Sequence, residues 1–240
     1  MQSKKFASGL GIAIHVRTSR VDSPRISYSY ISSAAVKIGE HILEISDDGE
    51  LLVNGDKASD EPSSFAGYSL ARNIKGSKGR ILAYTLYLGA SKIITIRANT
   101  KTGMVYVDID GYFGDSEGLL GAPAGAESES MGLLARDGEL DLTGHWNTFG
   151  EEWQVRDTDP MLFKERRAPQ YPAGCVYEAP KADLKAKYVR RRLMEDATGV
   201  SRDVATAACA NLAAGQKQEF CIADVMATGD LELAEDPFYN

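Results

Sequence analysis

Apolar residues recur at every second position along much of the first 160 residues. The alternation is clearest in four stretches, residues 10–16, 81–88, 92–98 and 104–109. A period of two is typical of a β-strand that buries one face and exposes the other. Shorter stretches of the same kind predict further strands near residues 26–30, 36–38, 43–45, 51–53, 133–136 and 140–142.

Turn signals separate these stretches. Asp48-Gly49, Asn54-Gly55 and Asp137-Gly138 are pairs that tolerate the positive φ of a tight hairpin. No helix-length periodic segment lies between the predicted strands, which argues against a parallel sheet with crossover helices. The sequence therefore predicts a mainly β domain over residues 6–165, built as an antiparallel β-sandwich or meander.

The pattern changes after this β domain. Pro169, Pro172 and Pro180 mark a connector over residues 166–180, because proline cannot continue a hydrogen-bonded ladder. Residues 181–236 then form a small helical unit in which apolar side chains recur with helical spacing. Three helices are predicted there, over residues 182–198, 202–214 and 218–227. Ser201 is expected to cap the second helix, and Gly229 to follow the end of the third.

Composition narrows the classes of partner. The chain has 240 residues, of which 43% are hydrophobic, so it can bury one large core or a core with a satellite. Its net charge of -7 argues against nucleic acid and anionic membranes, which would repel it, and is compatible with proteins or glycans. No apolar run approaches the roughly 20 residues that insert into a membrane. No signal peptide is visible, so a secreted form would need one upstream of Met1.

One pentapeptide, Gly114-Asp115-Ser116-Glu117-Gly118, fits the nucleophile elbow of serine hydrolases. An elbow requires a helix directly after the nucleophile. Residues 119–125 are instead rich in glycine and proline, and the only later histidine, His145, lies in a turn flanked by glycine. We therefore predict that the chain is not an enzyme, expect a polar turn here, and keep a hydrolase at Ser116 as a remote alternative.

Acidic residues and histidines are the candidate metal ligands of this sequence. Asp108, Asp110, Asp115 and Glu117 lie close together in the sequence, but their spacing does not match an EF-hand. Asp108 and Asp110 would share one face of a strand, so a solvent-exposed strand edge is the simpler expectation. The three histidines lack a second ligand at metal spacing, and His15 is expected to be exposed. No cofactor is predicted from these residues.

The C-terminal unit contains two further features. Arg190-Arg191-Arg192 admits three interpretations: a solvated helix face, a contact with an acidic partner, or a basic processing site. Cys209 and Cys221 fall on the predicted second and third helices, where a disulfide would close a loop of 13 residues and stabilise the unit by about 3 kcal/mol. In a reducing compartment they would be buried thiols. We favour the disulfide because so small a unit holds a core poorly unaided.

The middle of the chain resembles the von Willebrand factor type D domain. That family carries a Gly-Leu-Cys-Gly-Asn-like segment and then a Phe-Gly-x-x-Trp-x-Val segment. Here the corresponding runs are Gly118-Leu119-Leu120-Gly121 and, about 30 residues later, Phe149-Gly150-Glu151-Glu152-Trp153-Gln154-Val155. The tail, with Cys209 and Phe220-Cys221-Ile222-Ala223-Asp224-Val225, is similar to a reduced version of the eight-cysteine helical module that follows such domains. Phe149 and Trp153 are expected to anchor the last strand in the core.

The resemblance implies an extracellular or cell-surface module for protein–protein adhesion or assembly. The chain departs from the family at Leu120, where the family has Cys, and at Ala122, where it has Asn. The resemblance implies calcium as a cofactor, but the family's ligand loop is not matched over residues 122–130, so no calcium ligands are predicted. The family's opening strand is absent, so the N-terminus is expected to be truncated and Cys175 to be unpaired or bonded to an upstream cysteine. A carbohydrate-binding module that uses Tyr84, Tyr87, Tyr106 and Tyr112 is the main alternative.

Overall fold

Seven antiparallel strands form the larger of two main sheets. Their order is β12-β1-β2-β3-β4-β5-β6. The bounds in that order are β12 (Glu117–Gly118), β1 (Gln2–Lys4), β2 (Ile12–Asp22), β3 (Ser27–Ile38), β4 (His41–Ile45), β5 (Leu51–Val53) and β6 (Asp56–Lys57). The two longest strands of this sheet, β2 and β3, form a hairpin in which Ile12 lies opposite Ile38 and Asp22 lies opposite Ser27.

The computed structural model describes most of both sheets and the C-terminal helices. The described residues are 2–4, 11–22, 27–58, 62–75, 81–89, 91–111, 113, 116–118, 133–134, 140–141, 150, 153–156, 158–165, 198–235 and 239. The predicted connector over residues 166–180 and residues 182–197 of the first predicted helix, which include Arg190-Arg191-Arg192, lie outside them.

Five antiparallel strands form the second sheet. Their order is β11-β10-β9-β8-β7. The bounds are β11 (Met104–Asp110), β10 (Lys92–Asn99), β9 (Ile81–Gly89), β8 (Tyr68–Lys75) and β7 (Ser64–Phe65). A separate two-stranded hairpin pairs β13 (Leu133–Leu134) with β14 (Leu140–Asp141), as the turn at Asp137-Gly138 predicts.

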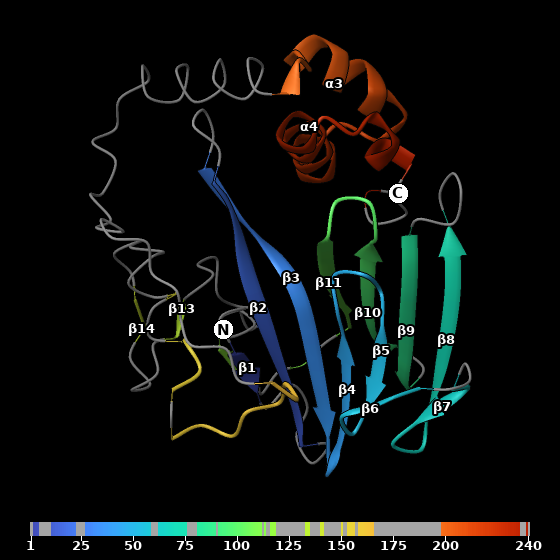
Figure 1. Cartoon of the computed structure of the whole chain (residues 1–240), viewed down its shortest axis with the longest axis vertical. Coiled ribbons are helices and arrows are strands. Elements are labelled where there is room, and N and C mark those ends of the chain that lie inside the picture. Colours follow the sequence, from blue (N-terminus) through green and yellow to red (C-terminus); the bar gives the residue numbers. More distant parts are fainter. Residues whose placement is uncertain are drawn as a thin grey trace.

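The core lies between the two main sheets, which face each other in Figure 1. The larger sheet contributes Ile14, Val36 and Leu43, while the smaller contributes Leu86 and Ile94. All are buried apolar residues at alternate positions of their strands, so the period of two does correspond to one buried face. The predicted mainly β fold with a small C-terminal helical unit is confirmed.

A hairpin turn also joins the two sheets. Gly49 lies between β4 and β5 with φ of 79°, a value that glycine adopts readily. A side chain there would collide with Leu82 of the opposite sheet, and the Tyr84 hydroxyl donates to the Gly49 carbonyl at 3.2 Å. The Asp48 carboxylate accepts from the Ser46 hydroxyl and from the backbone N–H of Glu50, which lowers the pKa of Asp48. The predicted turn therefore positions both sheets.

The two long strands β3 and β8 differ from the prediction, and the short strands β1, β6, β7 and β12 were not predicted. The strands predicted at residues 26–30 and 36–38 are joined in one strand, β3, whose described bounds begin at Ser27, because residues 31–35 continue the ladder and the small residues 32–35 are buried. Strand β8 was not predicted, although Tyr68, Leu70 and Ile74 follow the period of two. Its pattern is weakened by Arg72, which stands at an inward position and places its guanidinium 6.0 Å from the centre of the Tyr84 ring.

The C-terminal unit contains α3 (Arg202–Ala208), η2 (Cys209–Asn211), α4 (Gln216–Thr228) and η3 (Leu231–Glu235). Ser201 caps α3 as predicted, because its side chain accepts a hydrogen bond from the N–H of Val204. Gly229 ends α4 in the left-handed conformation, also as predicted. No helix in the described part of the chain is long and apolar enough to cross a membrane.

Candidate functional site

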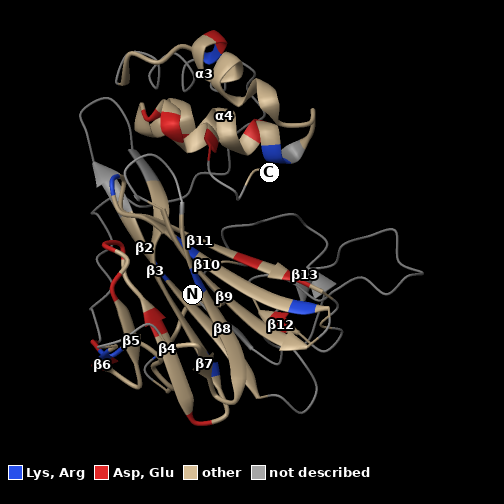
Figure 2. Cartoon of the chain, turned by 90° about the vertical axis from the view of Figure 1, so that its right-hand side faces the viewer, with Lys and Arg blue, Asp and Glu red and all other residues tan. Residues whose placement is uncertain are grey.

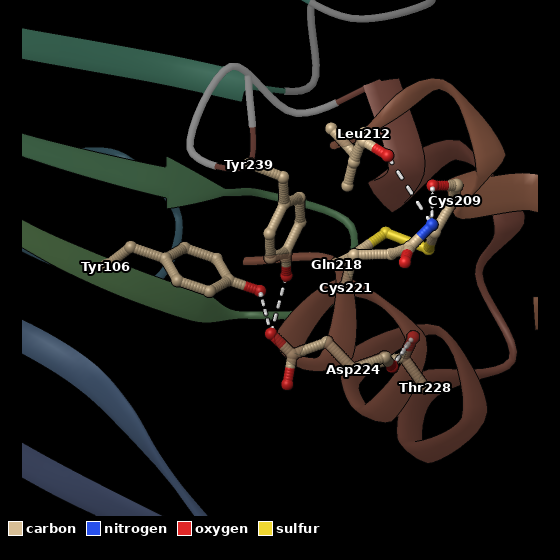
Figure 3. Close-up of a disulfide and its surroundings, with 8 residues drawn as sticks. All are labelled: Tyr106, Cys209, Leu212, Gln218, Cys221, Asp224, Thr228 and Tyr239. Carbon is tan, nitrogen blue, oxygen red and sulfur yellow. Dashed lines mark hydrogen bonds between the residues drawn. A yellow bond between two sulfur atoms is a disulfide. The ribbon is translucent and has the colours of Figure 1, made fainter. Parts of the chain in front are cut away.

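A disulfide holds the C-terminal unit together. Cys209, at the end of α3, is bonded to Cys221 on α4, with 6.2 Å between the two Cα atoms. Both cysteines are buried in a small apolar cluster that also contains Ile222, Val225 and Leu233. The Gln218 side chain donates to the backbone carbonyls of Cys209 and Leu212 (Figure 3). The predicted pairing of Cys209 with Cys221 is present in the structure.

A buried contact between the helical unit and the five-stranded sheet centres on the carboxylate of Asp224. Asp224 points from α4 toward the sheet and accepts two phenol hydrogen bonds on Oδ2 (Figure 3). One comes from Tyr106 on β11 at 3.4 Å, and the other from Tyr239 at 2.5 Å. The two tyrosine rings meet edge to face, with their centres 6.4 Å apart. This Tyr106–Asp224–Tyr239 group joins the sheet, a helix and the C-terminal end of the chain.

The electrostatics of this group favour one protonation pattern. Burial, the neighbouring Tyr106 and the charge of Asp224 all raise the pKa of Tyr239 far above its ordinary value. Tyr239 therefore stays protonated and remains a donor at any physiological pH. A carboxylate that receives two phenol donors is a stable polar contact, and Tyr239 is held in its donating, neutral form.

An ion pair forms a second contact between the helical unit and the sheet. Lys101, in the turn between β10 and β11, places Nζ 2.7 Å from Oδ1 of Asp230. Asp230 is only 5% exposed and also accepts from the N–H of Glu232 at the start of η3. Together with Asp224, this pair anchors the helical unit at the β10–β11 end of the sheet, as Figure 1 shows.

The outer face of the larger sheet is covered by a segment that we call the strap, residues 161–165. Leu162 and Phe163 pack on Ala35 of β3. Arg17 lies 4.2 Å from the centre of the Phe163 ring and donates to the Glu165 carbonyl at 2.6 Å. The N–H of Lys164 donates to the buried carboxylate of Glu44 at 2.8 Å. Three strands thus fix the strap by packing, cation–π and hydrogen-bond contacts.

The prediction that His15 is exposed was wrong. His15 is 3% exposed, because it points to the face of β2 that the strap covers. Its Nδ1 has no hydrogen-bond partner in the described part of the chain. Burial lowers the pKa of His15 from 6.5 to about 4, while Asp159 acts weakly in the opposite direction. His15 is therefore a neutral, buried side chain at neutral pH.

Of the predicted core anchors, the structure describes Trp153. Its side chain is 1% exposed, so its burial is confirmed, but residues 153–156 form a turn and an extended stretch rather than a strand. Phe149 lies outside the described residues, as does Cys175. Trp153 therefore anchors a loop that leads to the strap.

Ser116 and the acidic residues near it do not form one site in the described part of the chain. The N–H of Ser116 donates to the Phe113 carbonyl at 3.0 Å, and Glu117–Gly118 then forms β12, so a strand rather than a helix follows Ser116. Asp108 pairs with Arg97 at 3.5 Å, and Asp110 is exposed on the same face. No group of three potential metal ligands occurs among the described residues. Figure 2 shows charged residues spread over both units.

The three described tyrosines of the carbohydrate alternative do not form one exposed surface. Tyr84 is buried in the core, and Tyr106 is occupied in the contact with Asp224. Tyr87, which is 42% exposed, points to the opposite side of β9 from Tyr84, as the period of two predicts. Tyr112 lies outside the described residues. Of these three described tyrosines, only Tyr87 is exposed.

Comparison with known proteins adds no relative. No protein-family model matches the sequence, and no curated protein is similar to it at a significant level.

Proposed function

We propose that the chain is a non-enzymatic module for protein–protein adhesion or assembly that works outside the cell or at its surface. The observation that carries the proposal is the Cys209–Cys221 disulfide. Such bonds persist in oxidising environments and are rare where thioredoxin and glutathione keep thiols reduced. The resemblance of residues 118–121 and 149–155 to the von Willebrand factor type D domain supports the same class of function.

The architecture supports an interaction role in a second way. The disulfide closes the helical unit, and the Tyr106–Asp224–Tyr239 group and the Lys101–Asp230 pair fix that unit on the sheet. A module fixed in this way presents its outer surfaces in a constant arrangement, which limits the entropy lost on binding. Calcium is left outside the proposal, because the family's ligand loop is not matched in residues 122–130.

The first experiment is a thiol count on protein recovered from its native source, alkylated without reductant. We expect Cys209 and Cys221 to be protected from alkylation. Label on both residues would place the protein in a reducing compartment and overturn the extracellular function. The same digest reports on Cys175, which is labelled if its thiol is free and protected if it is bonded to another cysteine.

A carbohydrate-binding function has one observation in its favour, the exposure of Tyr87 on the outer face of β9. Aromatic rings on a flat sheet can stack against sugar rings. A glycan array with the full chain tests this, with Tyr87→Ala compared against Tyr68→Ala. A signal that is lost only in Tyr87→Ala would favour glycan binding over protein assembly.

A further inference from the structure

His15 is enclosed between β2 and the strap. On β3, the residue opposite His15 is Ala35, which forms an apolar cluster with Phe163 of the strap. On β2, Ala13 packs against this cluster, and Arg17 places its guanidinium over the Phe163 ring. Ala13 and Arg17 flank His15 on the same face of the strand, because side chains two positions apart point to one side. These contacts surround His15, which is 3% exposed.

The buried imidazole of His15 is incompletely hydrogen bonded. Its Nδ1 has no hydrogen-bond partner in the part of the chain that the structure describes. A neutral imidazole has one donor nitrogen and one acceptor nitrogen, whereas the protonated ring has two donors and a charge. Burying that charge without a full set of acceptors costs far more than burying the neutral ring. The closed strap therefore favours the neutral form of His15, in line with its lowered pKa of about 4.

Positive charges on the sheet disfavour a charge on His15. Three basic residues belong to the same face, each two positions from His15 or from a residue opposite it: Arg17 on β2, Lys4 on β1 and Lys37 on β3. The residue of β1 that lies opposite His15 is the uncharged Gln2. Lys37 lies 3.9 Å from the carboxylate of Glu40, whose side chain is almost fully exposed. The positive charge of the amino terminus also lowers the pKa of His15.

The buried carboxylate of this face serves the strap rather than His15. Glu44 of β4 lies opposite Ala35, so the whole width of β3 separates it from His15. Its Oε2 accepts a hydrogen bond from the backbone N–H of Lys164 at 2.8 Å. Glu44 therefore stabilises the closed strap without offering an acceptor to a protonated His15.

The segment that leads into the strap contributes a carboxylate that favours a charge on His15. Asp159 raises the pKa of His15, but by less than burial lowers it. Its Oδ2 accepts from the backbone N–H of Arg156 at 2.7 Å. The side chains of Arg156, Lys164 and Glu165 are exposed, so solvent screens their charges. Burial beneath the strap is thus the dominant influence on His15.

Opening the strap would reverse the preference for the neutral ring. In water, His15 regains its ordinary pKa of 6.5. Below pH 6.5 the open state therefore binds a proton that the closed state does not, so a fall in pH toward 4 favours the open state. The strap cluster shares no residue with the core between the sheets, so the strap can open without unfolding the sandwich.

We propose that the strap is a pH-sensitive device: in acid, protonation of His15 releases residues 161–165 from the outer face of the larger sheet while the sandwich stays folded. Release uncovers the apolar residues Ala35 and Ile42 and frees the carboxylate of Glu44 from the strap. The inference goes beyond the adhesion or assembly function proposed above and does not depend on it.

Hydrogen exchange of the full, oxidised chain at pH 7 and pH 5 tests the inference. Each rate is divided by the intrinsic rate of the same amide at that pH, which gives the open fraction. The amide of Lys164, which donates to Glu44, reports on the strap. We expect its open fraction to rise about twentyfold from pH 7 to pH 5, the factor that pKa values of about 4 and 6.5 imply. The amides of Ile94 and Ile96 in β10 should be more strongly protected at both pH values.

Four variants identify the group that titrates. His15→Leu and His15→Gln both remove it and should reduce the rise to less than about threefold. The glutamine variant keeps a polar side chain, so the result does not depend on how leucine packs. Glu44→Gln keeps an acceptor for the Lys164 amide and removes the other buried titratable group of this face, so the full rise should remain. His41→Leu, at an exposed histidine, should also behave as the wild type.

Three outcomes would overturn the inference. They are an open fraction of the strap that is the same at pH 7 and pH 5, a rise that both His15 variants retain, and equal protection of the Lys164 and β10 amides. The last outcome would mean that the strap opens only when the sandwich unfolds. None of them bears on the thiol count, so the extracellular function would survive. Conversely, labelled Cys209 and Cys221 would overturn that function and leave the release of the strap intact.

Discussion

At the scale of single residues, His15 is a buried titratable group that the strap keeps out of water. Its pKa is about 4 in the folded chain and 6.5 in the unfolded chain. Below pH 6.5 the unfolded chain therefore binds a proton that the folded chain does not. The stability that neutral His15 confers is complete above pH 6.5 and is lost as the pH falls toward 4, by an amount on the order of 3 kcal/mol.

This dependence can be measured by urea unfolding between pH 7 and pH 4.5. We expect the wild type to lose more stability over this range than His15→Leu, which removes the titrating group and keeps a side chain of similar size. His41→Leu, at an exposed histidine, serves as the control and should follow the wild type. Equal slopes for the wild type and His15→Leu would show that His15 does not titrate as its burial implies.

The hydroxyl of Tyr239 is a second single group whose contribution to stability can be measured. Tyr239→Phe keeps the buried ring and deletes only the donor to Asp224, so it should lower the free energy of unfolding by about 2 kcal/mol. Tyr106→Phe removes a longer hydrogen bond, 3.4 Å against 2.5 Å, and should have a smaller effect. Tyr87→Phe, at an exposed tyrosine, should change stability by less than about 0.5 kcal/mol. Thermal or urea unfolding ranks the three variants, and a larger effect for Tyr106→Phe would contradict the geometry.

At the scale of elements, the alternation of apolar and polar residues predicts the position of a strand where burial of one face determines it. Alternation located β2, β4, β9, β10 and β11, because each buries one face between the two sheets. The same alternation predicted that His15 is exposed. That prediction was wrong, because the opposite face of β2 is covered by residues 161–165, which lie far away in the sequence.

The contact at Asp224 could not be predicted from a local sequence pattern either. Tyr106 and Asp224 are 118 residues apart, and neither lies in a motif that indicates the other. The disulfide could be predicted, because two cysteines beside apolar residues on consecutive predicted helices suffice to suggest it. Polar contacts between distant elements leave no comparable signal in a single sequence.

The disulfide carries a prediction for the helical unit. Replacing both cysteines, Cys209→Ser/Cys221→Ser, should destabilise the unit by about 3 kcal/mol, because the unfolded chain regains the entropy of an open loop. The apolar clusters of the helical unit and of the sandwich share no residue, so the sheets should stay folded. Circular dichroism during urea unfolding should show helix lost before strand. Cys175→Ser is the control, and a concerted loss of helix and strand would contradict independent cores.

At the scale of the whole molecule, hydrogen bonds and an ion pair connect the helical unit to the sandwich, beside the edge-to-face contact of Tyr106 with Tyr239. The ion pair joins Lys101 to Asp230, and Asp230 is buried, so Lys101→Met would leave a buried carboxylate without its cation. We therefore expect faster hydrogen exchange in α4 and η3 of Lys101→Met, with exchange in β9 and β10 unchanged. Lys57→Met removes an ion pair of similar length, 2.6 Å, that lies within the sandwich and should leave the helices unaffected. Unchanged exchange in α4 and η3 of Lys101→Met would mean that the pair does not hold the helical unit in place.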